Sequence, residues 1–375
     1  MHIMFAGGGT GGHLFPGLAV AEAVARREPA ARISFCGTGK EWERTQVAAA
    51  GYDYHSLPAA PLVASPLGVL RAIYSNGVGY RAARRIIESA LPDVVVGLGG
   101  YSSLPLGLAA ARLGVPLVLL EQNLIPGRAN RWLARWAATV CVSFDESAEQ
   151  FSVRPRIVAT GNPVRAAIID ASAERANAAS QFRDTSPLLV ILGGSQGAHS
   201  INQHVVESLG RVAGYLADWQ IIHQTGAKDA DWVRAAYAAV GLNCDVRPFI
   251  SDMADVYRRA TLAVARAGAT TLAELAVAGV PAILLPFPFA AANHQWHNAQ
   301  AFGRAGSAIV VDDRPEPGRS ATALVSGLMP LLRLPELRRE MRLSMLKIAQ
   351  PSAASAIVDE IHAVAANSRL ARQSA

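Results

Sequence analysis

The 375-residue chain lacks any run of about 18 uninterrupted apolar residues, the length that a membrane-spanning helix needs. Its start, Met1-His2-Ile3-Met4-Phe5, also lacks the basic stretch and apolar core of a secretory signal peptide. We therefore expect a protein that stays in the cytoplasm. Cysteine is scarce, and Cys36, Cys141 and Cys244 are far apart without CxxC spacing. They predict buried free thiols, and neither a disulfide framework nor a zinc site.

Lysine is also rare, and none follows the glycine-rich segment near the start of the chain. Without that lysine there is no phosphate loop of the ATPase type, so ATP hydrolysis is not expected. The chain has no aromatic RNA-binding motif, no Cys/His finger and no long basic run, which makes nucleic acid the weakest candidate partner. The net charge of +6 nevertheless favours partners with negative charge, either nucleotide phosphates or an anionic membrane surface.

The composition is that of a globular protein, with 51% hydrophobic and 17% charged residues. A chain of this length exceeds the size at which one core stops growing, so we expect two domains. Short apolar runs alternate with helical patterns, which predicts an α/β fold with two doubly wound, Rossmann-like domains of parallel strands. The pattern breaks near Gly161–Arg165, and we place the domains at residues 1–163 and 164–349.

The predicted strands are apolar on both faces. They are Ile3–Ala6, Ile33–Cys36, Val94–Val96, Leu117–Leu120 and Val140–Val142 in the first half, and Leu188–Leu192, Gln220–His223, Leu262–Ala265, Ala282–Leu285 and Ala308–Val311 in the second. Helical spacing is found at Pro16–Arg27, Leu104–Leu113 and Thr271–Ala278, with Pro16 and Pro105 at the first-turn position that suits proline. In such sheets ligands bind beyond the carboxyl ends of the strands.

A glycine-rich turn, Gly7-Gly8-Gly9-Thr10-Gly11-Gly12-His13, follows the first predicted strand. It matches GxGxxG, whose amides at a helix N-terminus can hold a diphosphate. An NAD-binding domain would place an acidic residue at the end of the second strand, but that strand ends in Cys36-Gly37-Thr38 and only Glu41 is near. His13 is a candidate general base, because a neutral imidazole can take a proton near pH 7. The alternative is that it caps the loop or donates to a phosphate.

Other predicted strands are followed by segments with the chemistry of a binding edge. Gly97–Ser103 is either a ligand turn or a plain glycine turn, whereas the polar run Glu121-Gln122-Asn123 favours a binding edge over packing. In the second half, Gly193–Gly197 echoes the first glycine turn. The segment Arg266–Glu274 could hold phosphates through its amides and a ribose through Glu274. The alternative is that Glu274 is a first-turn acid that complements the helix dipole.

Two patterns suggest metal-binding sites, but neither is favoured over a simpler interpretation. His294 and His297 are three residues apart, but no carboxylate or cysteine completes a ligand set. Asp229-Ala230-Asp231 matches a metal-binding DxD motif, yet its position at the start of a surface helix favours solvated charges. Asp312-Asp313 is likewise expected to lie in a loop.

The segment Leu62–Ile87 combines apolar residues with four arginines, Arg71, Arg81, Arg84 and Arg85. A basic helix with one apolar side can lie on an anionic membrane surface. The alternative is a helix packed on the sheet with a solvated basic face.

Taken in order, these segments closely resemble those of the MurG family of bacterial glycosyltransferases, family 28, over almost the whole chain. They are Gly7–Ala19, Gly99–Tyr101, Glu121–Asn123, Gly161–Arg165, Gly193–Ala198 and Gly268–Glu274. Members of the family transfer N-acetylglucosamine from UDP-N-acetylglucosamine (UDP-GlcNAc) to the lipid-linked muramyl pentapeptide lipid I, which gives lipid II. The resemblance implies the GT-B fold, with two Rossmann-like domains that face a central cleft and a C-terminal helix, about 350–375, that completes the first domain.

The resemblance also implies inverting transfer without a required metal or cofactor. It implies a peripheral protein at the cytoplasmic face of the bacterial inner membrane, with UDP-GlcNAc, lipid I, the anionic membrane surface and other cell-wall synthesis proteins as partners. His13 becomes the favoured base. The implied UDP-GlcNAc contacts are Thr10, Gly11, Gly12, Asn123, Arg165, Ser195, Ile250, Gly268, Ala269, Thr270, Thr271, Leu272, Ala273, Glu274, His294 and Gln295. The implied acceptor contacts are Tyr101, Glu121 and Asn202.

The chain departs from the family at Leu120, where some members carry a histidine just before Glu-Gln-Asn. If that histidine were the essential base, this chain would be impaired. Three other functions remain open at this point. They are a UDP-GlcNAc 2-epimerase, which binds the same nucleotide sugar, a glycolipid transferase with a different acceptor, and a membrane-bound nucleotide-sugar sensor without catalysis. The basic segment Leu62–Ile87 favours a lipid-linked acceptor over a soluble epimerase.

Overall fold

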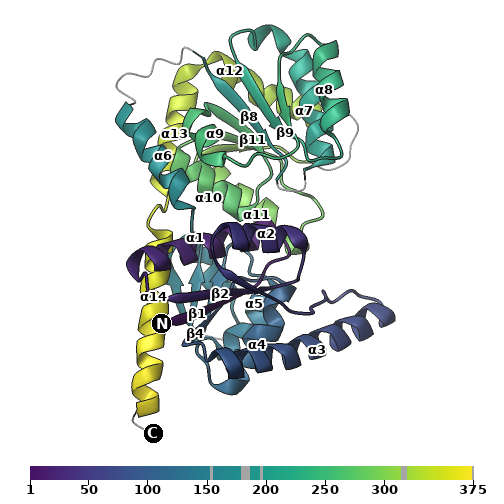
Figure 1. The fold of residues 1–375 in the computed structure, drawn as a ribbon. Coiled ribbons are helices and arrows are strands. Elements are labelled where there is room, and N and C mark those ends of the chain that lie inside the picture. Colours follow the sequence, from purple (N-terminus) through teal and green to yellow (C-terminus); the bar gives the residue numbers. More distant parts are fainter. Residues whose placement is uncertain (153–154, 179–185, 195–196, 314–318, 374–375) are drawn as a thin grey trace. The chain divides into compact units, whose positions relative to one another are not determined.

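The computed structural model describes the chain except residues 153–154, 179–185, 195–196, 314–318 and 374–375 (Figure 1). The chain divides into two compact units. The first comprises Met1–Arg165 together with Ser352–Ala375, and the second comprises Ala166–Pro351. Each unit is a parallel sheet covered by helices on both faces, as predicted, and each is described by itself. No helix among the described residues combines the length and the apolar character that crossing a membrane requires.

The first unit contains a seven-stranded sheet in the order β3-β2-β1-β4-β5-β6-β7. Its strands are β1 (His2–Ala6), β2 (Arg32–Gly37), β3 (Asp53–Ser56), β4 (Val94–Gly97), β5 (Leu117–Glu121), β6 (Thr139–Val142) and β7 (Arg156–Ala159). All neighbouring pairs are parallel, and Phe5 of β1 pairs in register with Phe35 of β2, so their rings stack 4.8 Å apart. The chain order reverses between β1 and β4, where open sheets of this type bind ligands.

The side chains of alternate residues in each strand point to opposite faces of this sheet. Ile3 and Phe5 pack with α1 (Gly11–Arg27) and α14 (Ala353–Gln373), whereas Met4 and Ala6 pack with α3 (Pro66–Ala90) and α4 (Leu104–Leu113). Figure 1 shows α1 on one side of β1 and β4, and α3 with α4 on the other. The remaining helices of the unit are α2 (Glu41–Ala49) and α5 (Arg128–Leu133), with the single turn η1 (Tyr101–Ser103) before α4.

The C-terminal helix α14 joins the first unit across a long stretch of sequence. Ile357, Val358 and Ile361 are almost fully buried in the core of that unit, where each is worth about 1.5 to 3 kcal/mol. Glu360 accepts two hydrogen bonds from the guanidinium of Arg156, at 2.5 and 2.9 Å. The predicted return of the C-terminal segment to the first domain is therefore present.

The second unit contains a six-stranded parallel sheet in the order β10-β9-β8-β11-β12-β13. Its strands are β8 (Leu188–Leu192), β9 (Gln220–Gln224), β10 (Asp245–Arg247), β11 (Leu262–Ala265), β12 (Ala282–Leu284) and β13 (Ala308–Val310). Its helices are α6 (Ala166–Ala178), α7 (His199–Arg211), α8 (Ala230–Ala239), α9 (Met253–Arg259), α10 (Ala269–Ala278), α11 (His294–Arg304), α12 (Arg319–Arg333) and α13 (Pro335–Ile348).

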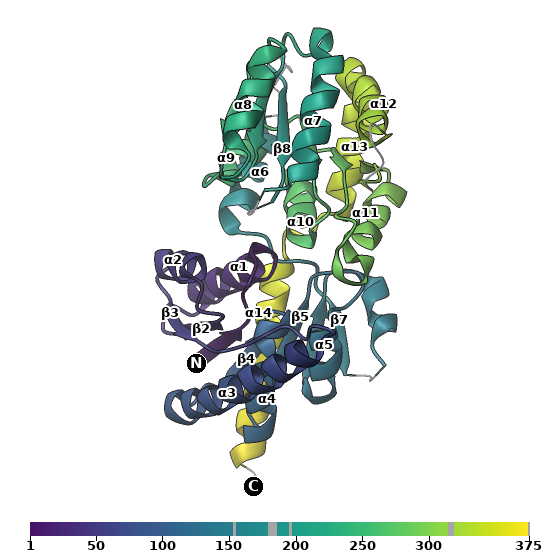
Figure 2. The ribbon, with the colours of Figure 1, turned by 90° about the vertical axis from the view of Figure 1, so that its right-hand side faces the viewer.

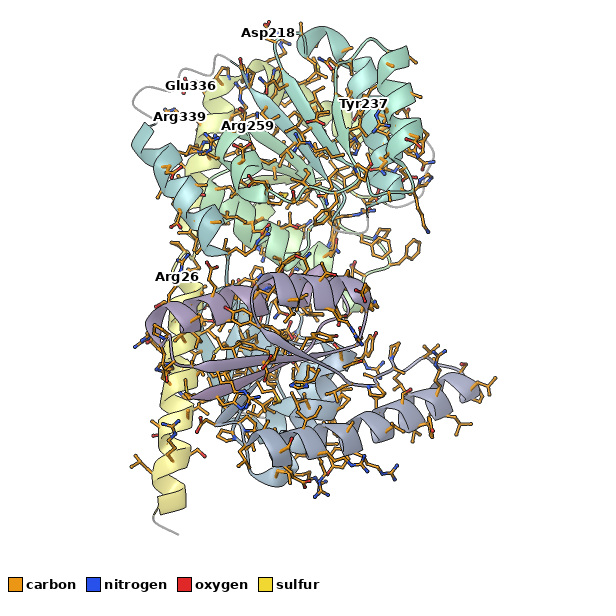
Figure 3. All side chains as sticks on the ribbon, in the orientation of Figure 1. Arg26, Asp218, Tyr237, Arg259, Glu336 and Arg339 are labelled. Carbon is orange, nitrogen blue, oxygen red and sulfur yellow. The ribbon has the colours of Figure 1, made fainter. Side chains whose placement is uncertain are left out.

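On one face of this sheet, a core cluster of the second unit lies between the strands and the helices α7, α8 and α12. Figure 2 shows α7, α8 and α12 with β8 in this unit. Tyr237 of α8, labelled in Figure 3, is 1% exposed and lies in this core, while Asp218 and Glu336 in the same view lie at the surface. Alternate residues of its strands again point to opposite faces of the sheet, and the carboxyl ends of the strands form the edge where ligands bind in such sheets.

Several predicted boundaries were wrong for identifiable reasons. Helix α1 begins at Gly11, so Pro16 is inside the helix and not in its first turn. Helix α10 begins at Ala269, two residues before the predicted start. The basic helix begins at Pro66, because Ser65 caps it by accepting a hydrogen bond from the Gly68 N–H and proline suits the first position.

Three strands were not predicted: β3, β7 and β10. Each is at the edge of its sheet and is only partly buried. Their sequences, such as Asp53-Tyr54-His55-Ser56, therefore lack the apolar run by which the central strands were recognised.

Candidate active site

In the first unit, His13 lies at the carboxyl edge of the sheet, as the third residue of α1. Its Nδ1 is 3.2 Å from Oε1 of Gln122, which directly follows β5. Burial lowers the pKa of His13 below its usual value, and the Gln122 side chain and the Leu98 carbonyl only partly oppose this effect. The imidazole is therefore neutral near pH 7, the state that can accept a proton.

The turn after β4 borders the His13 ring. Gly100 has a φ of 72°, and a Cβ at this position would lie 3.2 Å from both Cδ2 and Nε2 of His13. A side chain there would be strained by the backbone and would also crowd the imidazole. The predicted glycine turn Gly97–Ser103 is therefore part of the His13 site, and within it Tyr101 is the first residue of η1.

The first glycine turn is fixed by Glu43 of α2, which sequence reasoning missed. Its carboxylate is fully buried and accepts hydrogen bonds from the Gly9 N–H at 2.6 Å, the Thr38 N–H at 2.8 Å and the Tyr54 hydroxyl at 2.6 Å. A Cβ on Gly8 would lie 2.9 Å from a Glu43 oxygen, so the carboxylate fills the space against the turn. The one signal in the sequence was that Glu43 lies shortly after the second predicted strand, where Glu41 was considered as the acidic residue of an NAD-binding domain.

The polar run after β5 serves mainly to build its own loop. Glu121 is 3% exposed, and its carboxylate accepts hydrogen bonds from the N–H groups of Asn123 and Gly127 and from the Asn130 side chain. Burial raises the pKa of Glu121, and these hydrogen bonds oppose the rise. Glu121 therefore has a structural role in this loop, and its predicted contact with the acceptor stays a prediction. Asn123 stays partly exposed at the same edge.

The remaining predicted residues of the first unit lie around the start of α1. Thr10 is the exposed residue that precedes the helix, and Gly11 and Gly12 form its first turn. Their position at the N-terminus of a 17-residue helix suits the binding of an anionic group. The Arg165 guanidinium lies 4.9 Å from the centre of the Phe15 ring on the same helix. It thus brings a positive charge to the neighbourhood of His13.

In the second unit, the predicted donor segment forms the start of α10 after β11. Gly268 precedes the helix, and Ala269–Leu272 form its first turn, followed by Ala273. Glu274 is 6% exposed and lies in the second turn, where its Oε2 accepts a hydrogen bond from the Tyr257 hydroxyl at 3.1 Å. The alternative interpretation of Glu274 as a first-turn acid is therefore wrong.

A buried ion pair stands directly before this segment, and it was not predicted. Arg266 donates to Asp313 Oδ2 at 2.5 Å, to the Ser200 hydroxyl at 2.6 Å and to the Leu285 carbonyl at 2.9 Å. Burial alone would raise the pKa of Asp313, but His204, Arg266 and Ser200 together hold it below its ordinary value. Arg266 thus connects the ends of β11, β12 and β13. Asp313 lies in the loop after β13, as predicted, but its burial in an ion pair was not predicted.

A second buried network supports the end of β9. Asn202 of α7 is fully buried, with Nδ2 donating to the Thr225 carbonyl and to Asp229, and Oδ1 facing His223 Nε2 at 3.0 Å. Asn202 therefore has a structural role in this unit, and its predicted contact with the acceptor stays a prediction. Asp229 also faces His199 at 2.9 Å, so only Asp231 of the predicted solvated pair is exposed.

The other predicted donor contacts of the second unit lie in its loops. Ile250 is buried after β10, and His294 begins α11 with Nδ1 at 2.7 Å from the Ala291 carbonyl. Gln295 Oε1 accepts a hydrogen bond from the Phe287 N–H at 2.9 Å, which ties α11 to the loop after β12. Ser195 lies outside the described residues. Within the described part of the chain, no three His, Cys, Asp or Glu side chains gather as a metal site.

Comparison with known proteins assigns both units to one family. The N-terminal domain model of glycosyltransferase family 28 matches residues 3–142, and its C-terminal domain model matches residues 188–353. A relative from Anaeromyxobacter sp. (strain K) is 40% identical over 360 residues, 96% of this chain and 92% of its own. It is named UDP-N-acetylglucosamine--N-acetylmuramyl-(pentapeptide) pyrophosphoryl-undecaprenol N-acetylglucosamine transferase.

Solved structures agree with this assignment. The crystal structure of MurG from Acinetobacter baumannii superimposes with a TM-score of 0.74 at 30% identity, covering 96% of this chain and 99% of that one. A UDP-GlcNAc 2-epimerase from Neisseria meningitidis matches with a TM-score of 0.67 over 96% of this chain and 99% of that one, but at 14% identity, which indicates a shared fold alone. The chain belongs to glycosyltransferase family 28.

Proposed function

We propose that this chain transfers N-acetylglucosamine from UDP-GlcNAc to the C4 hydroxyl of the N-acetylmuramyl sugar of lipid I, which gives lipid II for peptidoglycan synthesis. The observation that carries the proposal is the 40% identity, over 96% of the chain, with a relative named for this reaction. The epimerase alternative rests on a fold likeness at 14% identity. A shared fold does not by itself imply a shared reaction.

In the proposed reaction His13 is the base. Its Nε2 takes the proton from the C4 hydroxyl as that oxygen forms a bond to the anomeric carbon of N-acetylglucosamine. The bond from the anomeric carbon to the diphosphate breaks, and UDP leaves with the electron pair. Attack on the face opposite the leaving group inverts the configuration. The neutral state of His13 and its place beside two ligand turns support this role.

The start of α10 is the proposed site for the diphosphate of the donor. Its first-turn amides and the positive end of a 10-residue helix would stabilise the negative charge that grows on the leaving UDP. Glu274 would accept from the ribose hydroxyls, and Ile250 would contact uracil. With this charge stabilised by helix amides, the reaction needs no metal ion, and we expect full activity in EDTA.

We also propose that the outer side of α3 binds the anionic membrane surface that carries lipid I. Exposed apolar side chains gather at the start of this helix and before it: Leu62, Val63, Leu67, Leu70, Ile73 and Tyr74. The exposed arginine Arg71 lies among them, and Arg81, Arg84 and Arg85 follow, of which Arg84 faces Glu88. Apolar insertion beside basic residues is the combination that a lipid surface with negative charge attracts.

The transfer is tested with labelled UDP-GlcNAc and a short-chain lipid I analogue. The purified protein should give a β-linked disaccharide product, and the His13→Ala variant should be slower by roughly 100-fold or more. Epimerised free sugar without a transfer product would overturn the assignment. A near-normal rate of the variant would instead exclude His13 as the base.

Membrane binding is tested by sedimentation with vesicles of phosphatidylglycerol and phosphatidylcholine, against phosphatidylcholine alone. The triple variant Leu67→Ser, Leu70→Ser, Ile73→Ser should lose binding to the anionic vesicles. The matched control, Leu334→Ser with Leu343→Ser, removes exposed apolar residues of the second unit and should bind as the unchanged protein does. Equal binding by both variants would rule out α3 as the membrane contact.

A further inference from the structure

The side chain of Gln122 has one orientation that satisfies its surroundings. It is 2% exposed, and its Nε2 lies 3.1 Å from the Leu98 carbonyl and 3.4 Å from the Leu120 carbonyl. Both partners are acceptors, so the amide nitrogen must face them. Oε1 consequently faces the opposite way, to Nδ1 of His13 at 3.2 Å.

An amide oxygen can only accept, so this contact requires a proton on Nδ1 of His13. A neutral imidazole carries one ring proton, which leaves Nε2 with a free lone pair. We infer that Gln122 is a positioning residue that selects the Nδ1–H tautomer of His13 and thereby leaves Nε2 to accept the proton of the incoming hydroxyl. This inference rests on the proposed function, because it assigns a role in the same proton transfer.

The ring is held in place as well as in its tautomer. The positions that Cβ atoms would take on Gly99 and Gly100 lie 3.2 to 3.4 Å from ring atoms of His13, so the backbone after β4 lies close to the ring. Nε2 lies on the side of Gly100 and Nδ1 on the side of Gln122. Gln122 therefore acts on the nitrogen that is remote from the one that takes the proton.

No ionic neighbour among the described residues accounts for the shifted pKa of His13, since burial, Gln122 and the Leu98 carbonyl are its causes. From the β5 loop, Glu121 directs its carboxylate to Asn123 and Gly127. The titratable group of η1 is Tyr101. The charged group beside α1 is Arg165, whose guanidinium lies over the Phe15 ring. A carboxylate placed at position 122 would thus be the first anion in direct contact with the His13 ring.

The tautomer can be read without turnover by two-bond ¹H–¹⁵N correlation of the histidine rings in the full chain at pH 8. The His13 signals are those that disappear in His13→Asn. We expect the pattern of an Nδ1–H imidazole in the unchanged protein and a mixed or Nε2–H pattern in Gln122→Leu. An Nε2–H pattern in the unchanged protein would overturn the inference.

The second test is the pH dependence of kcat/KM for transfer to the lipid I analogue. The acidic limb of the unchanged enzyme should lie below pH 6.5, the usual value for histidine. In Gln122→Glu a carboxylate faces Nδ1–H and should move this limb up by about 1 to 3 pH units, with the rate above it retained. The control Gln150→Glu adds the same charge at an exposed position of the first unit and should leave the limb in place.

Gln122→Leu should lower kcat by about 10-fold or more with little change in KM for UDP-GlcNAc, because the base loses its orientation. A limb in Gln122→Glu that coincides with that of the unchanged enzyme would refute the role of Gln122. The two proposals fail in different ways. Absence of transfer by the unchanged enzyme refutes the proposed function, whereas normal transfer with an unshifted limb refutes the inference alone.

Discussion

The carboxylate of Glu43 accepts the backbone N–H of Gly9 at 2.6 Å, across 34 residues of sequence. The same carboxylate accepts from Thr38 and Tyr54, while Lys40 donates to the Gly9 carbonyl at 3.0 Å. The glycine turn that leads into α1 is therefore held in place by hydrogen bonds with α2 and with the segment between β2 and α2. This matters for His13, which is only four residues after Gly9.

Glu43→Gln should destabilise the fold and slow transfer. A glutamine presents an N–H2 group where one carboxylate oxygen now accepts hydrogen bonds, so either Gly9 N–H or Thr38 N–H loses its acceptor. A buried donor without a partner costs about 1 to 3 kcal/mol in the free energy of unfolding. Urea denaturation measures this loss, and Glu41→Gln, an exposed acid of the same helix, is the control. Equal stability of the two variants would contradict the role of Glu43.

Glu43 also shows what could not be predicted from the sequence. The central strands and the loops at their carboxyl ends were predicted, because buried parallel strands are continuous apolar runs. Glu41 and Glu43 both lie on α2 with similar neighbours, and only the fold determines which one is buried against the turn. The buried hydrogen-bond partners of Asp313 and Asn202 were not predicted for the same reason, since they are remote in sequence. The edge strand β3 was missed because it is half exposed.

Asp313→Asn should be strongly destabilising, because it leaves the Arg266 guanidinium buried without its counter-ion. Breaking such a pair from one side costs about 3 to 5 kcal/mol. The exposed pair of Asp231 and Arg234 provides the control, and Asp231→Asn should change stability by less than about 1 kcal/mol. Thermal or urea unfolding at pH 7 compares the two variants. Similar losses would mean that Arg266 finds another partner.

The stabilisation by Asp313 should also depend on pH, with a definite sign. The pKa of this carboxyl is lower in the folded protein than its ordinary value of about 3.9 in an unfolded chain. Its contribution is therefore complete above about pH 4 and is lost as the pH falls through the folded value. The stability difference between the unchanged protein and Asp313→Asn should shrink when unfolding is measured at about pH 3, and a constant difference would argue against an ionic origin.

The C-terminal helix should contribute to stability through its apolar face. Ile361 is fully buried against the first unit, so Ile361→Ala should cost about 2 to 5 kcal/mol. Leu370 is 64% exposed on the same helix, and Leu370→Ala should have little effect. Alanine is the strongest helix former, so neither substitution weakens the helix itself and the comparison in urea reports burial. Equal effects would mean that α14 adds little to the core.

Gly100→Ala should impair catalysis beyond its effect on stability. Gly100 has φ 72° and ψ 170°, a backbone conformation that is nearly exclusive to glycine, whereas Gly114 has φ 69° and ψ 20°, in the left-handed helical region. Alanine should therefore cost about 1 to 2 kcal/mol in strain at position 114 and at least as much at position 100. A Cβ on Gly100 would lie 3.2 Å from Nε2 of His13, whereas a Cβ on Gly114 would meet nothing within 4 Å. Both variants should therefore unfold at lower urea concentrations than the unchanged protein, but under conditions where both are folded only Gly100→Ala should show a reduced kcat. A reduced kcat in both would mean that backbone strain in these turns, and not contact with the imidazole, limits the reaction.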